Sequence, residues 1–487
     1  MATRVAAGRA KYLAKRNPQR ALYKTLFRNG MAEEAIRTEV DRFLNSKKKV
    51  LRWEFGLALS QLHHLGLYDL ALKLSETLNQ RGMTRRHQDL ALYFDLVTKT
   101  RGIKEAEKCF IEIPDFAKTQ PPYNALLKCY CEERMTEKAE GIMKKMKELR
   151  LASTPVPYNL LMTLYIKTDH PERIPLMIQE MKTDDIMLDV HSYNLWMKGI
   201  AATGDVSGAE RVFEEMKSDG QVMVDWTTYN HLALIYVEAG LFDKAEVMLT
   251  ELENRINDGD LEAYQCLIRL YGRTGNLVKV HQLWQSLKPV IPMTQLNKSY
   301  LNMMRALADL NELPNLETCF KEWESLCETH DIHVVNVMME AYAKAGLIDK
   351  AIDIQNHALV RGAKLNSKTH EILMDYYWKG GEFVSTIKCI SDAVSARGEG
   401  TKWVPPMEIV VSLMGHFKRE DDVDGAEAFL NVLEESGMKL GAEVFEPLIQ
   451  TYAYSGKTNR LMRRRLKMEN VVVSDETDKL LDIVCVE

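Results

Sequence analysis

A short run near the carboxyl terminus is the stretch most similar to a nucleotide-binding loop. Ser455-Gly456-Lys457-Thr458 ends in the Gly-Lys-Thr that cradles phosphates in such loops. The full motif needs a glycine at position 451, where this chain has Thr451, and it follows a β-strand. Because the run joins two stretches with helical patterning, we interpret it as a turn between helices.

Other catalytic and metal-binding signatures are incomplete. His370-Glu371 continues Ile-Leu-Met, so the second histidine of a zinc-protease motif is absent. Cys129 and Cys131 have no partner cysteine or histidine pair at zinc spacing, and His63-His64 stands alone in a helical stretch. The zinc-deaminase signature is also missing. We therefore expect a non-enzyme with no catalytic residue, metal, cofactor or small-molecule substrate.

One set of polar residues recurs at a fixed period. The dipeptide Tyr-Asn begins at residues 158, 193 and 229, at spacings of 35 and 36 residues. An acid stands four residues before the mark that follows, at Asp189, Asp225 and Asp260. The amides Asn159, Asn194 and Asn230 offer both a hydrogen-bond donor and an acceptor. A period in this range indicates a solenoid of repeats.

Each repeat has the pattern of two helices. Tyr123, Leu126, Leu127 and Tyr130 are spaced as one apolar helix face. Eleven residues after the mark a glycine can end that helix in the left-handed conformation, at Gly204, Gly240, Gly275, Gly346 and Gly456. A small residue follows at position +16 of a second helix, at Ala139, Ala209, Ala245 and Ala351. Two helices cannot bury both faces alone, so each repeat needs neighbours.

In register, these residues resemble the pentatricopeptide repeat family. Its motif has Tyr-Asn, a glycine at the helix turn, an alanine in the second helix and a closing Asp, whereas the related 34-residue tetratricopeptide repeat lacks the regular Tyr-Asn and Asp. The chain resembles the pure-repeat branch, which carries no nuclease or deaminase. We predict an all-α fold, a right-handed α-solenoid of antiparallel helix pairs.

The resemblance implies that one repeat reads about one RNA base with two or three side chains. In the family, Asn in the first helix with Asp closing the unit favours uracil, which applies to Asn159 with Asp189, Asn194 with Asp225, and Asn230 with Asp260. Asn336 with Asn366 is a pyrimidine-type pair that leans to cytosine. The alternative for each Asn is a polar residue of the first turn with no RNA role.

Most repeats depart from that code. Asn124 is paired with Thr154, Gln265 with Leu296, Leu301 with Asp331 and Glu371 with Trp403. Glu408 and Glu446 place acids where a base reader belongs, and these would repel a phosphate strand. The sequence therefore predicts three consecutive uracil-type positions in a chain that is otherwise poorly legible.

Length and composition favour one elongated domain. The chain has 487 residues, 46% of them hydrophobic, a net charge of −5 and eight scattered cysteines, which suits a reducing compartment. No apolar run approaches the ~18 residues of a membrane span. We expect a basic segment over residues 1–18, a solenoid of about twelve repeats over 19–470, and a tail over 471–487.

The amino-terminal residues are basic. Residues 1–32 carry eight Lys or Arg and no acid, which resembles a mitochondrial targeting segment. The alternatives are a basic first helix or an arm on phosphate, and a chloroplast is the second possible organelle.

Clusters of cations form a second candidate interface. The densest comprises Arg460, Arg463, Arg464, Arg465 and Lys467, and smaller ones lie at residues 47–49 and 85–86. Such clusters bind phosphates and make affinity salt-dependent, and the alternative is a solvated helix face.

Three functions fit this sequence. We favour a structural subunit of the plant mitochondrial ribosome that contacts ribosomal RNA and ribosomal proteins, because phosphate contacts fix position without reading sequence. The alternatives are a factor that binds single-stranded RNA of one organellar transcript, and a protein-only scaffold.

Overall fold

The structure is a computed structural model of the chain. It describes residues 36–38, 40–42, 52–80, 87–256, 260–327, 330–396 and 403–485. These residues are helical or lie in turns and loops, and none of them forms a strand, so the predicted all-α fold is confirmed. The chain divides into two compact units, residues 1–239 and 240–487, each described here by itself.

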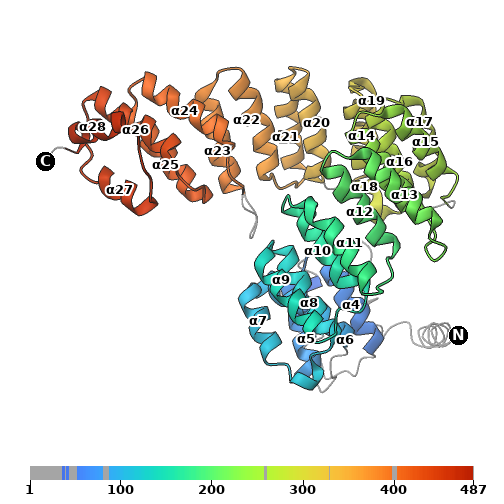
Figure 1. Cartoon of the computed structure of the whole chain (residues 1–487). Coiled ribbons are helices and arrows are strands. Elements are labelled where there is room, and N and C mark those ends of the chain that lie inside the picture. Colours follow the sequence, from blue (N-terminus) through green and yellow to red (C-terminus); the bar gives the residue numbers. More distant parts are fainter. Residues whose placement is uncertain are drawn as a thin grey trace. The chain divides into compact units, whose positions relative to one another are not determined.

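In the first unit the helices follow one another in pairs (Figure 1). They are α4 (Arg52–His64), α5 (Tyr68–Gln80), α6 (His87–Arg101), α7 (Ile103–Ile111), α8 (Gln120–Glu132), α9 (Thr136–Glu148), α10 (Pro155–Lys167), α11 (Ile174–Thr183), α12 (Val190–Ala202), α13 (Val206–Ser218) and α14 (Trp226–Glu238). Short 3₁₀ turns, η1 (Asp115–Ala117) and η2 (Pro171–Arg173), stand before α8 and α11.

The second unit continues the same alternation. Its helices are α15 (Phe242–Glu253), α16 (Leu261–Thr274), α17 (Leu277–Leu287), α18 (Leu296–Asp309), α19 (Leu313–Leu326), α20 (Ile332–Lys344), α21 (Ile348–Val360), α22 (Ser367–Lys379), α23 (Phe383–Ser395), α24 (Met407–Arg419), α25 (Val423–Ser436), α26 (Ala442–Ser455), α27 (Met462–Glu469) and α28 (Asp475–Val484). Two 3₁₀ turns, η3 (Lys288–Val290) and η4 (Met293–Gln295), separate α17 from α18.

The predicted glycines end helices, and the predicted alanines pack between them. Gly204, Gly240, Gly275, Gly346 and Gly456 all have φ between 69° and 88°, the left-handed conformation that glycine adopts without strain. Gly456 ends α26, which confirms that the Ser-Gly-Lys-Thr run is an inter-helix turn. The four alanines at position +16 are fully buried, so a small side chain is needed where the paired helices meet.

First helices stack on first helices within each unit. α8 packs on α10, α10 on α12, and α12 on α14; in the second unit α16 packs on α18, α18 on α20, and α20 on α22. At one contact the backbones come very close, since a Cβ on Gly272 of α16 would lie 2.8 Å from the Cα of Ala306 on α18. Each repeat thus buries its apolar face against the next, as the predicted α-solenoid requires.

A polar contact recurs between consecutive repeats, which we call the tyrosine–glutamate link. The tyrosine seven residues after the mark donates its hydroxyl hydrogen to a glutamate on the preceding second helix. The pairs are Tyr130 with Glu107 (2.8 Å), Tyr165 with Glu140 (3.0 Å), Tyr236 with Glu210 (2.8 Å), Tyr342 with Glu317 (2.7 Å) and Tyr452 with Glu427 (2.7 Å). The carboxylates of Glu107, Glu140 and Glu317 also bind a cation that stands eight residues past the tyrosine, namely Lys138, Arg173 and Lys350.

The links change how both partners titrate. Burial and the hydrogen bond to Glu140 raise the pKa of Tyr165 to about 12. The hydrogen bond from Lys138 lowers the pKa of Glu107, helped by the one from Tyr130. The link at Tyr165 therefore favours a neutral phenol, and the link at Glu107 favours an ionised carboxylate.

Some predictions concern residues that the structure does not describe, and others concern the expected tail and the absence of a membrane span. Residues 1–18 and the small basic clusters at 47–49 and 85–86 lie outside the described residues. Within the expected tail, α28 packs against α26. Across the described part of the chain, no helix has the length and apolar character needed to cross a membrane.

Removing one link should loosen the stack. Glu317→Ala leaves the hydroxyl of Tyr342, a residue only 7% exposed, without its acceptor. We expect the free energy of unfolding in urea to fall by about 1–2 kcal/mol. The matched control is Glu340→Ala, which removes only an exposed pair with Lys344 and should change stability by less than about 0.5 kcal/mol. Equal losses in the two variants would contradict a structural role for the link.

In alkali the linked tyrosines should ionise only as the protein unfolds. The raised pKa of Tyr165, about 12 against 10.0, contributes stability that is fully present below pH 10 and is lost as the pH rises towards 12. Helical circular dichroism and phenolate absorbance followed from pH 9 to 12.5 should change together. Tyr165→Phe should flatten the dependence of stability on pH, whereas the exposed Tyr454→Phe should not.

Candidate nucleic-acid interface

Asn159 and Asp189 lie in direct contact. Asp189 is the N-cap of α12 and accepts a hydrogen bond from the backbone N–H of Ser192 (2.7 Å). Asn159, on the neighbouring helix α10, donates from Nδ2 to Oδ1 of Asp189 (3.1 Å). Its own Oδ1 accepts from the hydroxyl of Ser192 (2.8 Å). The structure therefore brings this predicted pair together through a helix cap.

The pair Asn336 and Asn366 repeats that geometry in the second unit. Asn366 caps α22 with a capping box to Thr369. Asn336 of α20 donates from Nδ2 to Oδ1 of Asn366 (3.1 Å) and accepts from the hydroxyl of Thr369 (2.9 Å). A Ser or Thr three residues after the cap thus completes both sites, a third member that the sequence interpretation missed.

Asn194 and Asp225 are joined through an intermediate residue. Asp225 caps α14 and accepts from the hydroxyl of Thr227 (2.6 Å), and Asn194 of α12 donates to that same hydroxyl (3.3 Å). The Oδ1 of Asn194 is buried and has no hydrogen-bond partner among the described residues. A buried acceptor without a partner is costly, so this amide retains capacity for a donor from outside the protein.

The third predicted pair is divided between the two units. Asn230 lies on α14 of the first unit and is half-buried. Asp260 lies in the second unit, where it caps α16 by accepting from the backbone N–H of Ala263 (3.2 Å). Their pairing stays a prediction.

The repeats without a legible code use the same positions for other contacts. Gln265 donates to the hydroxyl of Ser299 (2.9 Å), and Trp403 donates its indole N–H to Glu371 (3.2 Å). Glu446 accepts from the backbone N–H of Ser474 (2.6 Å). The side chains at the reading positions of these repeats are thus also bound within the protein.

These geometries limit how the Asn side chains could bind RNA. Asn159, Asn194 and Asn336 are 4–6% exposed, and each uses its Nδ2 in an inter-repeat hydrogen bond. An amide nitrogen has two hydrogens and an amide oxygen two lone pairs. At Asn159 one amide hydrogen and one oxygen lone pair thus remain for hydrogen bonds to a pyrimidine edge. A structural role and a base-reading role are therefore compatible for this residue.

The five cations near the carboxyl terminus do not form one uniform patch. Arg465 is bound by Glu427 through two hydrogen bonds of 2.8 and 2.9 Å, and it thereby joins the last tyrosine–glutamate link. Arg463 pairs with Asp482 of α28 (2.6 Å). These two arginines have structural partners that a spacing argument could not reveal.

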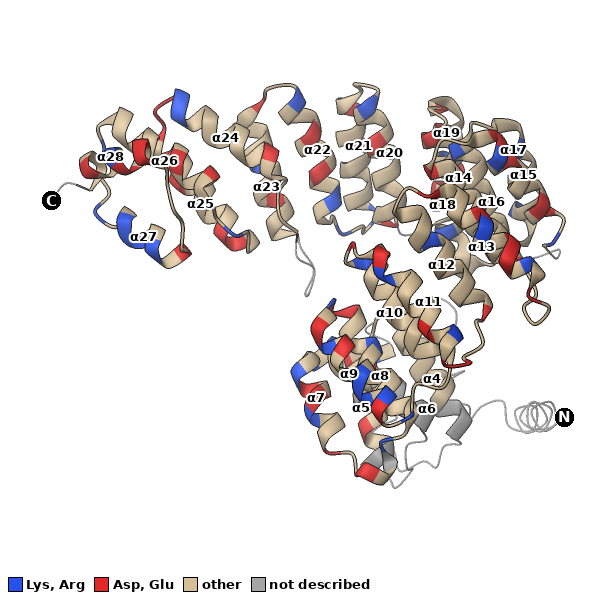
Figure 2. Ribbon diagram, in the orientation of Figure 1, with Lys and Arg blue, Asp and Glu red and all other residues tan. Residues whose placement is uncertain are grey.

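The other three cations are exposed. Arg460, Arg464 and Lys467 form no ion pair within the described part of the chain. Figure 2 shows Lys and Arg gathered over α27. Three exposed positive charges on one short segment can bind phosphates. The sequence had suggested five such charges.

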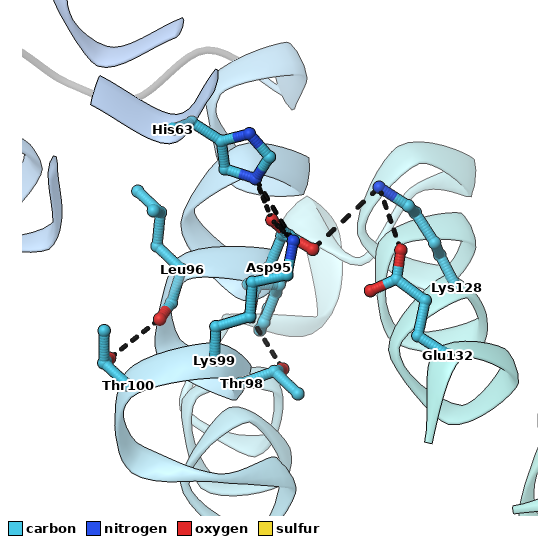
Figure 3. Close-up of polar contacts among 9 residues, drawn as sticks. His63, Asp95, Leu96, Thr98, Lys99, Thr100, Lys128 and Glu132 are labelled. Carbon is cyan, nitrogen blue, oxygen red and sulfur yellow. Dashed lines mark hydrogen bonds and ion pairs between the residues drawn. The ribbon is translucent and has the colours of Figure 1, made fainter. Parts of the chain in front are cut away.

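A buried carboxylate connects three consecutive repeats of the first unit. Asp95 of α6 is 3% exposed and is approached by His63 of α4, by Lys99 (3.0 Å) and by Lys128 of α8 (4.0 Å; Figure 3). Burial by itself would raise the pKa of Asp95, but hydrogen bonds from His63 and Lys99 lower it. The repeats of α4 and α6 lack Tyr-Asn, and there this charge network performs the linking role of the amide pairs.

Stacked helix pairs with capped amide sites define the class of helical-repeat proteins, and comparison identifies the family. A model described as "PPR repeat" matches residues 122–151, 227–255, 262–288 and 333–361, and one described as "Pentatricopeptide repeat domain" matches 176–238. A relative in Arabidopsis thaliana, "Large ribosomal subunit protein mL101 (rPPR4)", is 56% identical over 95% of this chain and 94% of its own. The chain therefore belongs to the pentatricopeptide repeat family, as the sequence resemblance predicted.

Further similarities extend along the chain. "Pentatricopeptide repeat-containing protein At1g02370, mitochondrial", also from Arabidopsis thaliana, is 31% identical over 96% of this chain and 87% of its own. Among solved structures, the pentatricopeptide repeat protein PPR10 in complex with an 18-nucleotide psaJ RNA element aligns with a TM-score of 0.43 at 15% identity, over 92% of this chain and 74% of that one.

If the amide pairs link the repeats, their loss should be measurable without RNA. Asn159→Ala removes the acceptor of Ser192 and the donor to Asp189, so we expect a loss of about 1–2 kcal/mol in urea unfolding. Asn230→Ala, at a half-buried amide, is the comparison and should cost less. Full stability of Asn159→Ala, together with weaker binding of a uridine-rich strand, would instead assign Asn159 to RNA alone.

Proposed function

We propose that this protein is a structural subunit of the large subunit of a plant mitochondrial ribosome, where it contacts ribosomal RNA and neighbouring ribosomal proteins. Its role is binding and not catalysis. The observation that carries the proposal is the 56% identity, over nearly the full length of both chains, to a protein named as a subunit of the large ribosomal particle. The mitochondrial relative at 31% identity supports the organelle.

The geometry of the repeats supports a permanent assembly. A transcript-specific factor would need many consecutive legible positions, whereas the repeats of Gln265, Glu371 and Glu446 depart from the base-reading code. A ribosomal subunit needs a stable shape with phosphate and protein contacts. The amide pairs and tyrosine–glutamate links supply such a shape by fixing successive repeats against one another.

We assign the phosphate contacts to the three exposed cations Arg460, Arg464 and Lys467. Phosphate contacts position a protein on folded RNA without reading its sequence. Arg463 forms an ion pair with Asp482 of α28, and Arg465 binds Glu427 of the last tyrosine–glutamate link. We therefore assign these two arginines a structural role.

Reversing the exposed charges should detach the protein from ribosomes without unfolding it. The variant Arg460→Glu, Arg464→Glu, Lys467→Glu should leave the large-subunit fraction of a density gradient at lower salt than the wild type, because phosphate contacts weaken with salt. The control reverses three exposed lysines elsewhere in the second unit, Lys321, Lys364 and Lys439. Circular dichroism should show intact helices in both variants, since surface substitutions seldom change stability by more than about 0.5 kcal/mol.

Two outcomes would contradict the proposal. If the wild-type protein sediments only in light fractions free of ribosomal RNA, it is not a ribosomal subunit, and a transcript-specific factor becomes the better assignment. If the wild type sediments with the large subunit and the charge-reversed variant does so equally at every salt concentration, the three cations are not the phosphate contact.

A further inference from the structure

Two histidines and a glutamate converge in the second unit, away from the amide pairs. Glu324 lies near the end of α19, His330 in the loop before α20, and His357 on α21. Oε1 of Glu324 is 3.5 Å from Nε2 of His330 and 3.0 Å from Nδ1 of His357. The three ligand atoms all lie within 4.8 Å of one another.

The convergent atoms are not satisfied by hydrogen bonds. His330 is 6% exposed, yet neither of its ring nitrogens has a hydrogen-bond partner among the described residues, and neither does Oε1 of Glu324. The 3.0 Å approach of His357 to Glu324 is close enough for an ion pair but lacks hydrogen-bond alignment. Buried polar atoms usually have partners, so these need a group that the protein itself does not supply.

A metal ion accounts for this arrangement. Zn²⁺ binds imidazole nitrogen at about 2.0–2.1 Å and carboxylate oxygen at about 2.0–2.2 Å, which places tetrahedral ligand atoms roughly 3.3–3.5 Å apart. Ligands around a metal aim at the ion and not at each other, so close atoms without hydrogen-bond alignment are the expected geometry. Two histidines and one glutamate are a known zinc ligand set that leaves a fourth position for water.

The surroundings hold the imidazole of His330 in place. Its ring lies 5.1 Å from the ring of Trp323 and 6.4 Å from that of Phe320, measured between centroids. This aromatic packing fixes the buried ring beside Glu324.

We propose that Glu324, His330 and His357 form a binding site for a divalent transition metal of the zinc type. The site connects α19 and α21, the second helices of consecutive repeats, with the loop that leads into α20. A bound ion would therefore fix the stacking of these two repeats. This proposal does not depend on the ribosomal assignment.

The test uses the full-length protein stripped with a chelator and titrated with Zn²⁺ by calorimetry. We expect one zinc ion per chain, an affinity at least about tenfold weaker in His357→Ala and Glu324→Gln, and a zinc-dependent rise in melting temperature that both variants lose. Co²⁺ should give the visible absorption of a tetrahedral site with nitrogen and oxygen ligands. Variants of the exposed His357 and of Glu324 are preferred because replacing the buried His330 could disturb folding.

The matched control is His170→Ala. It removes an exposed histidine whose Nδ1 lies 3.3 Å from Glu172, a similar contact with no third ligand in the described part of the chain. This variant should bind zinc as the wild type does. Equal zinc affinity in the wild type and His357→Ala, or binding to cysteine thiolates revealed by the cobalt spectrum, would overturn the site.

Discussion

The structure depends on the hydrogen bond between a tyrosine of one repeat and a glutamate of the repeat before it. A pair of helices buries only part of its apolar surface by itself, so the fold exists only if neighbours stay in register. Apolar contacts favour burial but are weakly directional. The tyrosine–glutamate link adds direction, because one hydroxyl and one carboxylate meet at 2.7–3.0 Å in each of the five links.

The amide pairs impose a second constraint on the same stack. Asn159 and Asn336 join a first helix to the cap of the next one, so a side chain that could read a base also holds two repeats together. Replacing such an amide alters the shape of the groove as well as its chemistry. The stack can therefore keep these links whether or not its amides read a base.

The last linked tyrosine that the structure describes, Tyr452, has a different cation on its glutamate. Arg460 stands eight residues after Tyr452, but the carboxylate of Glu427 is bound by Arg465 of α27 instead. α28 packs against α26, and Arg463 of α27 forms an ion pair with Asp482 of α28. Arg460, Arg464 and Lys467 remain exposed on the same segment.

The sequence by itself determined the helix pairs, the turns and the family, because these depend on local spacing. The glycines with positive φ, the buried alanines and the Tyr-Asn marks were all visible from their period. The resemblance to the family also implied the pairs Asn159 with Asp189, and Asn336 with Asn366, whose members lie 30 residues apart. Only the tertiary structure decided which polar groups are already bound. Arg465 looks like a free cation in the sequence but meets a carboxylate 38 residues away. Glu324, His330 and His357 have no motif spacing, and their convergence exists only because consecutive repeats stack, which places residues about one period apart at the same point in space.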